Sequence, residues 1–283
     1  MTKANFAVAC SAGGFKGVFV HGVLAALEAA GLRASAYAAS SVSVFPAGAA
    51  VVGRIQEEGL AQWTGALAVL EATGRPQAMI DWLTRGLMER TKAHLFQPTA
   101  SNLAIVASQA RADLSPDLRL GRQLLLAAAR HQGEWARQRF SAVSFDSRLG
   151  TLNPDNLLKV VQASTRLLHI WGEAVELEGQ RLLDASYSWA CPAPALLAYL
   201  DGPLVVLATD PGPVQLDIFG TPLPQFDHIL VSPDFAPESV GVEILRASPT
   251  GLSTLHEHGL EQGQKTSRSW KCVPCEKHWL KPC

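Results

Sequence analysis

Residues 5–32 read NFAVACSAGGFKGVFVHGVLAALEAAGL, and this stretch decides the fold class. Its apolar run at residues 6–10 leads into three glycines between positions 13 and 17, a pattern typical of a buried strand that turns directly into a helix. Apolar residues at helical spacing follow as far as Gly31, and glycine is common just after the end of a helix. We therefore predict a strand, a tight turn and a helix in succession.

The next segment repeats this order. A second apolar run at about residues 34–39 leads into three serines, and a helix of small residues is predicted at 44–52. Two strand–helix units in a row indicate a parallel sheet with helices on both of its faces. We accordingly predict an α/β protein of three layers, α/β/α, with a mostly parallel central sheet.

The rest of the chain extends that sheet. From about residue 57 to 139 the pattern is mostly helical and no strand is obvious, so we interpret this part as a helical insertion over the sheet. Residues 1–264 then form one domain, and residues 265–283 form a basic tail that contains cysteine and tryptophan. Further strands are predicted at 140–146, 181–186, 202–212 and 228–233, and further helices at 157–168 and 252–264.

The amino-acid composition and the net charge limit the classes of function that fit this chain. The 283 residues are 48% hydrophobic and 17% charged, which is enough apolar material for a large core. A formal net charge of −1 provides no field that would attract nucleic acid, so we expect no nucleic-acid partner.

No segment reaches 18 uncharged apolar residues, and the start MTKANFAVAC does not read as a secretory leader. Five cysteines, three of them in the tail, do not suggest a disulfide framework, so we expect a cytoplasmic protein.

The serines at the second strand–helix junction are the first candidates for chemistry. In the frame Ala39-Ser40-Ser41-Val42-Ser43, Ser41 has the central place of a nucleophile elbow, where small residues on either side let strand and helix pass closely. Ser40 and Ser43 are rival nucleophiles by residue type alone. A serine-rich helix cap explains the same residues without any chemistry.

The glycine turn supplies a second feature. The backbone amides around Gly13, Gly14 and Phe15 are expected to point into one space at a helix start, which suits an anion. The spacing fits neither a mononucleotide-binding nor a dinucleotide-binding loop. An oxyanion hole is therefore one interpretation, and a tight strand–helix turn with no chemical role is the other.

A nucleophilic serine also needs a base. None of the eight histidines stands in a loop typical of a catalytic base. His228 and His256 come nearest to such a context. The acid that stands out is Asp184, which ends an apolar run and is followed by small residues and prolines. An aspartate at the end of a strand is also a common turn or capping residue.

Taken together, three ordered segments resemble the patatin-like phospholipase family. That family has a glycine-rich G-G-G-x-[KR]-G segment, a G-x-S-x-G elbow one helix later, and a D-G-[GA] segment near the end of its catalytic domain. The corresponding segments here are AGGFKG at 12–17, ASSVS at 39–43 and DAS at 184–186. The flanking segment that begins at Ala163-Ser164 and closes with residues 179–184 is also similar to the family, and the similarity spans about residues 5 to 212.

The resemblance implies a lipid acyl hydrolase, of phospholipase A or carboxylesterase type, with a Ser–Asp dyad and an acyl-enzyme intermediate. Ser41 is then the nucleophile, Asp184 takes its proton, and the amides around Gly13 and Gly14 hold the oxyanion. The substrate is a lipid or another acyl ester, and neither a metal nor an organic cofactor is implied.

The resemblance also implies roles for neighbouring residues. Lys16 lies at the position that the family fills with lysine or arginine, near the oxyanion loop, although a solvated lysine at a helix start fits the same position. Ala39 and Ser43 support the elbow as its small flanking residues.

Glycine is missing from each of the three motifs, and this leaves alternatives open. Alanine or serine stands at Ala12, Ala39, Ser43 and after Asp184. A catalytically degenerate module that binds lipid or a protein partner is therefore the alternative to hydrolysis. A third interpretation, a histidine-using α/β-hydrolase, requires His228 or His256 at Ser41.

The tail carries a pattern of its own. Cys272, Cys275, His278 and Cys283 form a C-x2-C-x2-H-x4-C arrangement of residue types that bind zinc. A disordered basic terminus with incidental thiols explains the same residues. The tryptophans and lysines of this segment suit contact with an anionic lipid surface, which would add peripheral membrane contact to a cytoplasmic location.

Overall fold

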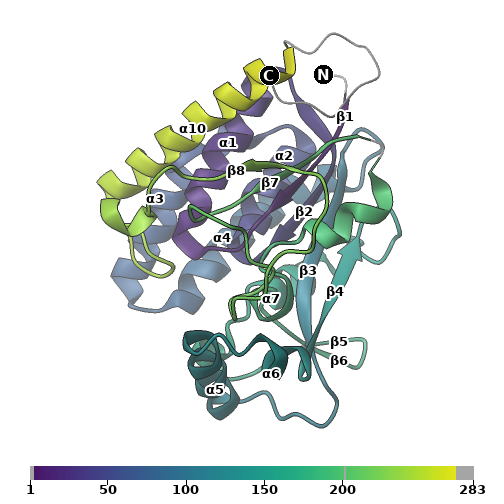
Figure 1. The fold of residues 1–283 in the computed structure, drawn as a ribbon, viewed down its shortest axis with the longest axis vertical. Coiled ribbons are helices and arrows are strands. Elements are labelled where there is room, and N and C mark those ends of the chain that lie inside the picture. Colours follow the sequence, from purple (N-terminus) through teal and green to yellow (C-terminus); the bar gives the residue numbers. More distant parts are fainter. Residues whose placement is uncertain (1–2, 201, 272–283) are drawn as a thin grey trace.

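A mixed β-sheet forms the centre of the molecule (Figure 1). The structure, a computed structural model, describes residues 3–200 and 202–271. Within these residues eight strands pair in the spatial order β5-β6-β3-β2-β1-β7-β8, and β4 also pairs with β3. The strands are β1 (Lys3–Cys10), β2 (Arg33–Ser40), β3 (Asn102–Ala110), β4 (Phe140–Asp146), β5 (Val175–Leu177), β6 (Gln180–Leu183), β7 (Leu204–Leu207) and β8 (Ile229–Val231).

The prediction of a mostly parallel sheet between helices is confirmed. Pairings β1–β2, β1–β7, β2–β3 and β7–β8 are parallel, whereas β4 and β6 run antiparallel to β3. The helices are α1 (Gly17–Ala29), α2 (Val44–Val52), α3 (Ile55–Thr73), α4 (Pro76–Leu95), α5 (Leu118–Ala129), α6 (Gly133–Arg137), α7 (Leu157–Ser164), α8 (Leu168–Trp171), α9 (Ser186–Trp189) and α10 (Pro249–Lys271). Short 3₁₀ turns are η1 (Gly14–Lys16), η2 (Ser41–Ser43), η3 (Ala193–Tyr199) and η4 (Pro237–Val240).

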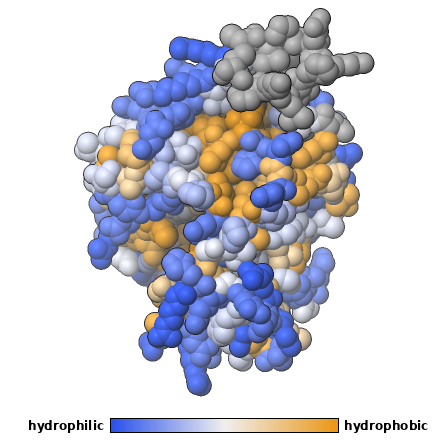
Figure 2. Space-filling model, viewed as in Figure 1, coloured by the Kyte–Doolittle hydropathy of each residue, from blue (hydrophilic) through white to orange (hydrophobic). Residues whose placement is uncertain are grey.

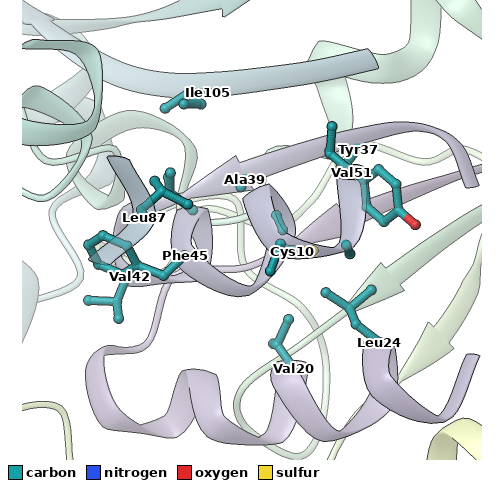
Figure 3. Close-up of a cluster of buried hydrophobic side chains, with 14 of the residues drawn as sticks. Cys10, Val20, Leu24, Tyr37, Ala39, Val42, Phe45, Val51, Leu87 and Ile105 are labelled. Atoms are coloured by element: carbon teal, nitrogen blue, oxygen red, sulfur yellow. The ribbon is translucent and has the colours of Figure 1, made fainter. Parts of the chain in front are cut away.

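The two faces of the sheet differ in the size of their side chains. Because side chains alternate along a strand, Cys10, Tyr37 and Ile105 all point to one face, where they pack against α1 and α2 (Figure 3). The helical layer on this face is thick and buries most of the core. The opposite face is lined mainly by alanines and packs against η3, which small side chains allow to approach closely. The alanines of this face are Ala7, Ala9, Ala36, Ala38 and Ala104.

One part of the predicted topology is wrong. The stretch 57–139 was expected to contain no strand, yet β3 lies within it and pairs with β2, β4 and β6 near the middle of the sheet. Two helix ends also differ. The predicted helix 157–168 ends at Ser164, and the last helix continues to Lys271. Residues 265–271 of the predicted tail therefore belong to α10.

The surface shows a division between the two ends of the molecule. Figure 2 shows apolar residues gathered in the upper half of one face and mostly hydrophilic residues at the lower end, over α5 and α6. Ile229, Leu230 and Ile244 are among the large apolar side chains that are exposed. No helix in the described part of the chain combines the length and the apolar character needed to cross a bilayer.

Candidate active site

Ser41 lies on a sharp turn where β2 ends and the chain enters α2. Ser40 is still extended, with φ −123° and ψ 137°, whereas Ser41 has φ 54° in the left-handed region. A residue other than glycine is rare in this region and costs about 1–3 kcal/mol there, so surrounding contacts must hold it in place. The strained, single-residue reversal is the backbone geometry of a nucleophile elbow.

The Ser41 hydroxyl meets a carboxylate. Ser41 Oγ donates a hydrogen bond to Asp184 Oδ2 at 2.8 Å, and the amide of Ser186 donates to Asp184 Oδ1 at 2.9 Å. Asp184 is fully buried, at 0% exposure, and Ser41 is 6% exposed. Burial raises the pKa of Asp184 to about 6, and its hydrogen bonds with Ser186 and Ser41 oppose that rise. A carboxylate with this pKa is a better proton acceptor at neutral pH than an ordinary aspartate.

Strand β3 brings the two residues together. Ser40, the last residue of β2, is paired with Val106, and Leu183, the last residue of β6, is paired with Ser108. Because β2 runs parallel to β3 and β6 runs antiparallel to it, their carboxyl ends face each other along the same strand. Ser41 directly follows β2 and Asp184 directly follows β6. The two residues therefore meet opposite Ala107, the one residue of β3 between the two pairings.

Ser164, at the end of α7, joins the two segments by further hydrogen bonds. Its hydroxyl accepts from the amide of Ser41 at 3.0 Å, and its carbonyl accepts from the amide of Ala185 at 3.2 Å. The carbonyl of Arg166 accepts from the amide of Asp184 at 3.0 Å. Ser164 is fully buried. Its hydroxyl therefore satisfies the Ser41 amide, a buried donor that would otherwise have no partner in water. In the sequence Ser164 stands out only as part of a flanking segment, because its hydrogen bonds depend on the three-dimensional pairing.

The small residues that flank Ser41 are buried, as an elbow requires. Ala39 packs in the core, and Ser43 Oγ donates a hydrogen bond to the carbonyl of Ser11 at 2.6 Å. Ser40 Oγ donates to the carbonyl of Trp189 at 2.7 Å. The hydroxyls of Ser40 and Ser43 are thus bonded to backbone carbonyls, whereas that of Ser41 is bonded to a carboxylate, which separates Ser41 from its two rivals.

The glycine turn leads from β1 into α1. Gly14 has φ 57°, and a Cβ atom built on Gly13 would lie 2.6 Å from the Thr209 side chain, so neither position accepts a larger residue easily. The amides of Gly13 and Gly14 have no hydrogen-bond acceptor among the described residues, whereas the amide of Phe15 donates to the carbonyl of Ile244 at 3.1 Å. Two of the three predicted oxyanion donors are therefore free.

Lys16 is not a solvated lysine, which was one of the two interpretations of this position. Its side chain is 8% exposed and forms ion pairs with Asp210 at 2.7 Å and with Glu238 at 2.5 Å. Burial alone would lower the pKa of Lys16, but the hydrogen bonds to Asp210 and Glu238 raise it above its usual value. Lys16 thus connects the glycine turn to two segments from late in the chain.

The structure places neither candidate histidine at Ser41. His256, on α10, lies against His21 of α1 with ring centroids 5.7 Å apart. His228 is exposed and lines a surface hollow of about 530 Å³ beside β8, whose lining does not include Ser41. The proton acceptor that the described residues offer to Ser41 is Asp184.

The zinc pattern of the tail, Cys272, Cys275, His278 and Cys283, lies outside the described residues. Within the part of the chain that the structure describes, no three histidine, cysteine or acidic side chains cluster as a metal site. Cys10 and Cys191 are buried free thiols.

Comparison with known proteins adds no family assignment. No protein-family model matches the chain, and no curated protein matches it significantly.

Proposed function

We propose that this chain is a serine hydrolase of acyl esters, patatin-like in its chemistry, that cleaves lipid or related esters of phospholipase A or carboxylesterase type. The observation that carries the proposal is the 2.8 Å hydrogen bond from Ser41 Oγ to Asp184 Oδ2, made by a serine at φ 54° and a carboxyl whose pKa burial raises to about 6. The order of the glycine turn, elbow and aspartate in the sequence supports the same assignment.

In the first half of this reaction Ser41 Oγ bonds to the ester carbonyl carbon while its proton passes to the Asp184 carboxylate. The amides of Gly13 and Gly14 are the donors available to the oxyanion that forms. The oxyanion then collapses, the bond to the alcohol oxygen breaks, and the alcohol leaves with the proton held by Asp184.

In the second half a water molecule adds to the acyl carbon and gives a proton to Asp184. Collapse of this second oxyanion releases the carboxylic acid, and Ser41 recovers its proton from Asp184. One base, Asp184, thus serves both halves of the reaction.

The test is hydrolysis of a p-nitrophenyl ester series and of a phospholipid by the wild type, Ser41→Ala and Asp184→Asn, with matched folding checked by circular dichroism. We expect turnover in the wild type and a loss of at least about a hundredfold in both variants. A fluorophosphonate probe should label the wild type and not Ser41→Ala. Ser40→Ala is the matched control because the Ser40 hydroxyl is bonded to Trp189 and not to Asp184.

The second candidate is a catalytically degenerate module that binds lipid or a protein partner. The near-complete burial of Ser41, at 6% exposure, favours it, because an ester must reach the hydroxyl to react. A wild type that hydrolyses no ester and takes up no fluorophosphonate, yet binds lipid vesicles, would establish this candidate and reject hydrolysis.

A further inference from the structure

A late segment of the chain lies directly over the glycine turn. We call residues 237–248 the strap; it consists of η4 and the hairpin that follows it. The carbonyl of Ile244 accepts the hydrogen bond from the Phe15 amide at 3.1 Å and lies 2.0 Å from where a Cβ atom of Gly14 would stand. Glycine at position 14 is thus required both by its φ of 57° and by the strap.

Hydrogen bonds within the strap fix its shape. The amide of Val242 donates to the carbonyl of Pro237 at 3.0 Å, and the amide of Glu243 donates to the carbonyl of Arg246 at 2.7 Å. The amide of Ser248 closes the hairpin by donating to the carbonyl of Gly241 at 3.1 Å. The Ile244 carbonyl is therefore presented by a short, closed loop and not by a free chain end.

An ion pair fastens the strap to the glycine turn. Lys16 follows the turn directly, and its buried ammonium contacts Glu238 of the strap and Asp210 of the loop after β7. The Lys16 side chain is 8% exposed, whereas those of Asp210 and Glu238 are about half exposed. A buried ammonium is costly unless it is paired, so Lys16 needs these carboxylates close to the turn. Thr209, next to Asp210, adds a hydrogen bond from its Oγ1 to the carbonyl of Ala12 at 2.7 Å.

We propose that the strap is a positioning element of the oxyanion hole: the Ile244 carbonyl and the Lys16–Glu238 ion pair hold the glycine turn so that the amides of Gly13 and Gly14 face the reacting ester. This rests on the function proposed above. Because Ile244 occupies the Phe15 amide, the hole has two amide donors from this turn instead of three. Glu238, Asp210 and Ile244 act through the turn and do not touch the ester.

The test compares Glu238→Gln with Glu243→Gln. Both remove one carboxylate from the strap, but the Glu238 side chain pairs with Lys16, and the structure gives no such pairing for Glu243. We expect Glu238→Gln to lower kcat on a short p-nitrophenyl ester roughly tenfold with KM unchanged, since a small displacement of transition-state donors acts on kcat. Glu243→Gln should match the wild type. Lys16→Met should lose at least as much as Glu238→Gln, and Lys16→Arg should recover most of it.

A second measurement does not depend on activity. Amide hydrogen exchange should show the Phe15 amide protected in the wild type and in Glu243→Gln, and faster exchange in Glu238→Gln. Equal kcat in Glu238→Gln and Glu243→Gln, or a rise in kcat, overturns the positioning role; a rise would mark the strap as a lid. If the wild type itself neither hydrolyses esters nor reacts with fluorophosphonate, the proposed function fails, whereas the exchange result still decides whether the strap holds the turn.

Discussion

The hydroxyl of Ser41 donates to the carboxylate of Asp184 at 2.8 Å, although 143 positions separate the two residues in the chain. Each of them directly follows a strand whose last residue pairs with β3. Ser164 accepts hydrogen bonds from the backbone amides of Ser41 and Ala185. In the proposed hydrolase this hydrogen bond makes Asp184 the acceptor of the serine proton, so several measurements depend on the ionisation of Asp184.

The first prediction concerns the pH dependence of turnover. Asp184 must be ionised to accept the Ser41 proton, and burial raises its pKa to about 6. We expect kcat/KM to rise with pH around a midpoint near that value, because kcat/KM reports the free enzyme. Ester hydrolysis with product measured at a pH-insensitive wavelength checks this. A flat profile, or a midpoint at the ordinary value for aspartate, would contradict the assignment of Asp184 as the base.

The second prediction concerns stability. The pKa of Asp184 is raised from 3.8 to about 6 on folding, so ionised Asp184 is less favourable in the folded than in the unfolded chain. The stabilising effect of its protonated form is fully present below the unfolded pKa and is lost as pH rises through the folded pKa. The wild type should therefore lose stability between pH 4 and pH 8, whereas Asp184→Asn has no such carboxylate. The unfolding free energy of Asp184→Asn should rise relative to that of the wild type by up to about 3 kcal/mol over this range.

Urea denaturation at several pH values measures this gain. The control is Asp113→Asn, whose carboxylate is exposed and pairs with Arg111. An exposed ion pair of this kind contributes little to stability, so Asp113→Asn should stay close to the wild type throughout. Parallel curves for Asp184→Asn and the wild type would mean that Asp184 is not destabilised by burial.

The third prediction concerns Ser164 as a positioning residue. Ser164→Ala leaves the Ser41 amide without its acceptor in a buried place, which costs about 1–3 kcal/mol of folding stability. We also expect kcat to fall with little change in KM, and Ser164→Thr, which keeps a hydroxyl, to restore part of it. Ser267→Ala is the matched control because it removes a buried hydroxyl that donates to the carbonyl of Gln264 within α10, away from Ser41. Equal kcat in the Ser164→Ala and Ser267→Ala proteins would remove Ser164 from the catalytic arrangement.

The fourth prediction uses the backbone of the elbow. Ser41 has φ 54°, so Ser41→Gly should be more stable than Ser41→Ala by about 1 kcal/mol, since glycine accepts this conformation without strain. Ser43 has φ −67°, and there the order should reverse, with Ser43→Gly less stable than Ser43→Ala. Thermal or urea denaturation of the four variants gives both differences. A Ser41→Ala protein at least as stable as Ser41→Gly would show that Ser41 is not strained.

The sequence predicted much of this arrangement because its signals are local. The first strand, the glycine turn and the helix that ends before Gly31 follow from short patterns, and the structure has them where they were expected. Ser41 was a candidate because it stands between small residues at a strand–helix junction, and Asp184 because it ends an apolar run. Their meeting depends on β6 running antiparallel to β3, which no local pattern predicts.

Strand β3 escaped prediction for a physical reason. Its residues, NLAIVASQA, include three alanines and no regular alternation of polar and apolar side chains, because the strand is buried on both faces. Alanine also has the highest helix propensity, and the surrounding sequence is helical. Only pairing with β2, β4 and β6 decides that this segment is extended. The ion pairs of Lys16 were equally hidden, since Asp210 and Glu238 lie some 200 positions away.

The three residues Val106, Ala107 and Ser108 have a consequence for how this protein can change over time. Because Ser41 and Asp184 are both set against this one short stretch of β3, their separation does not depend on the length of any connection between the strands. The exposed loops at residues 74–75, before α4, and 130–132, after α5, can therefore change in length without moving the serine from the aspartate. The outer loops and the Ser41–Asp184 pair can thus diverge independently, while an insertion within those three residues would separate the pair at once.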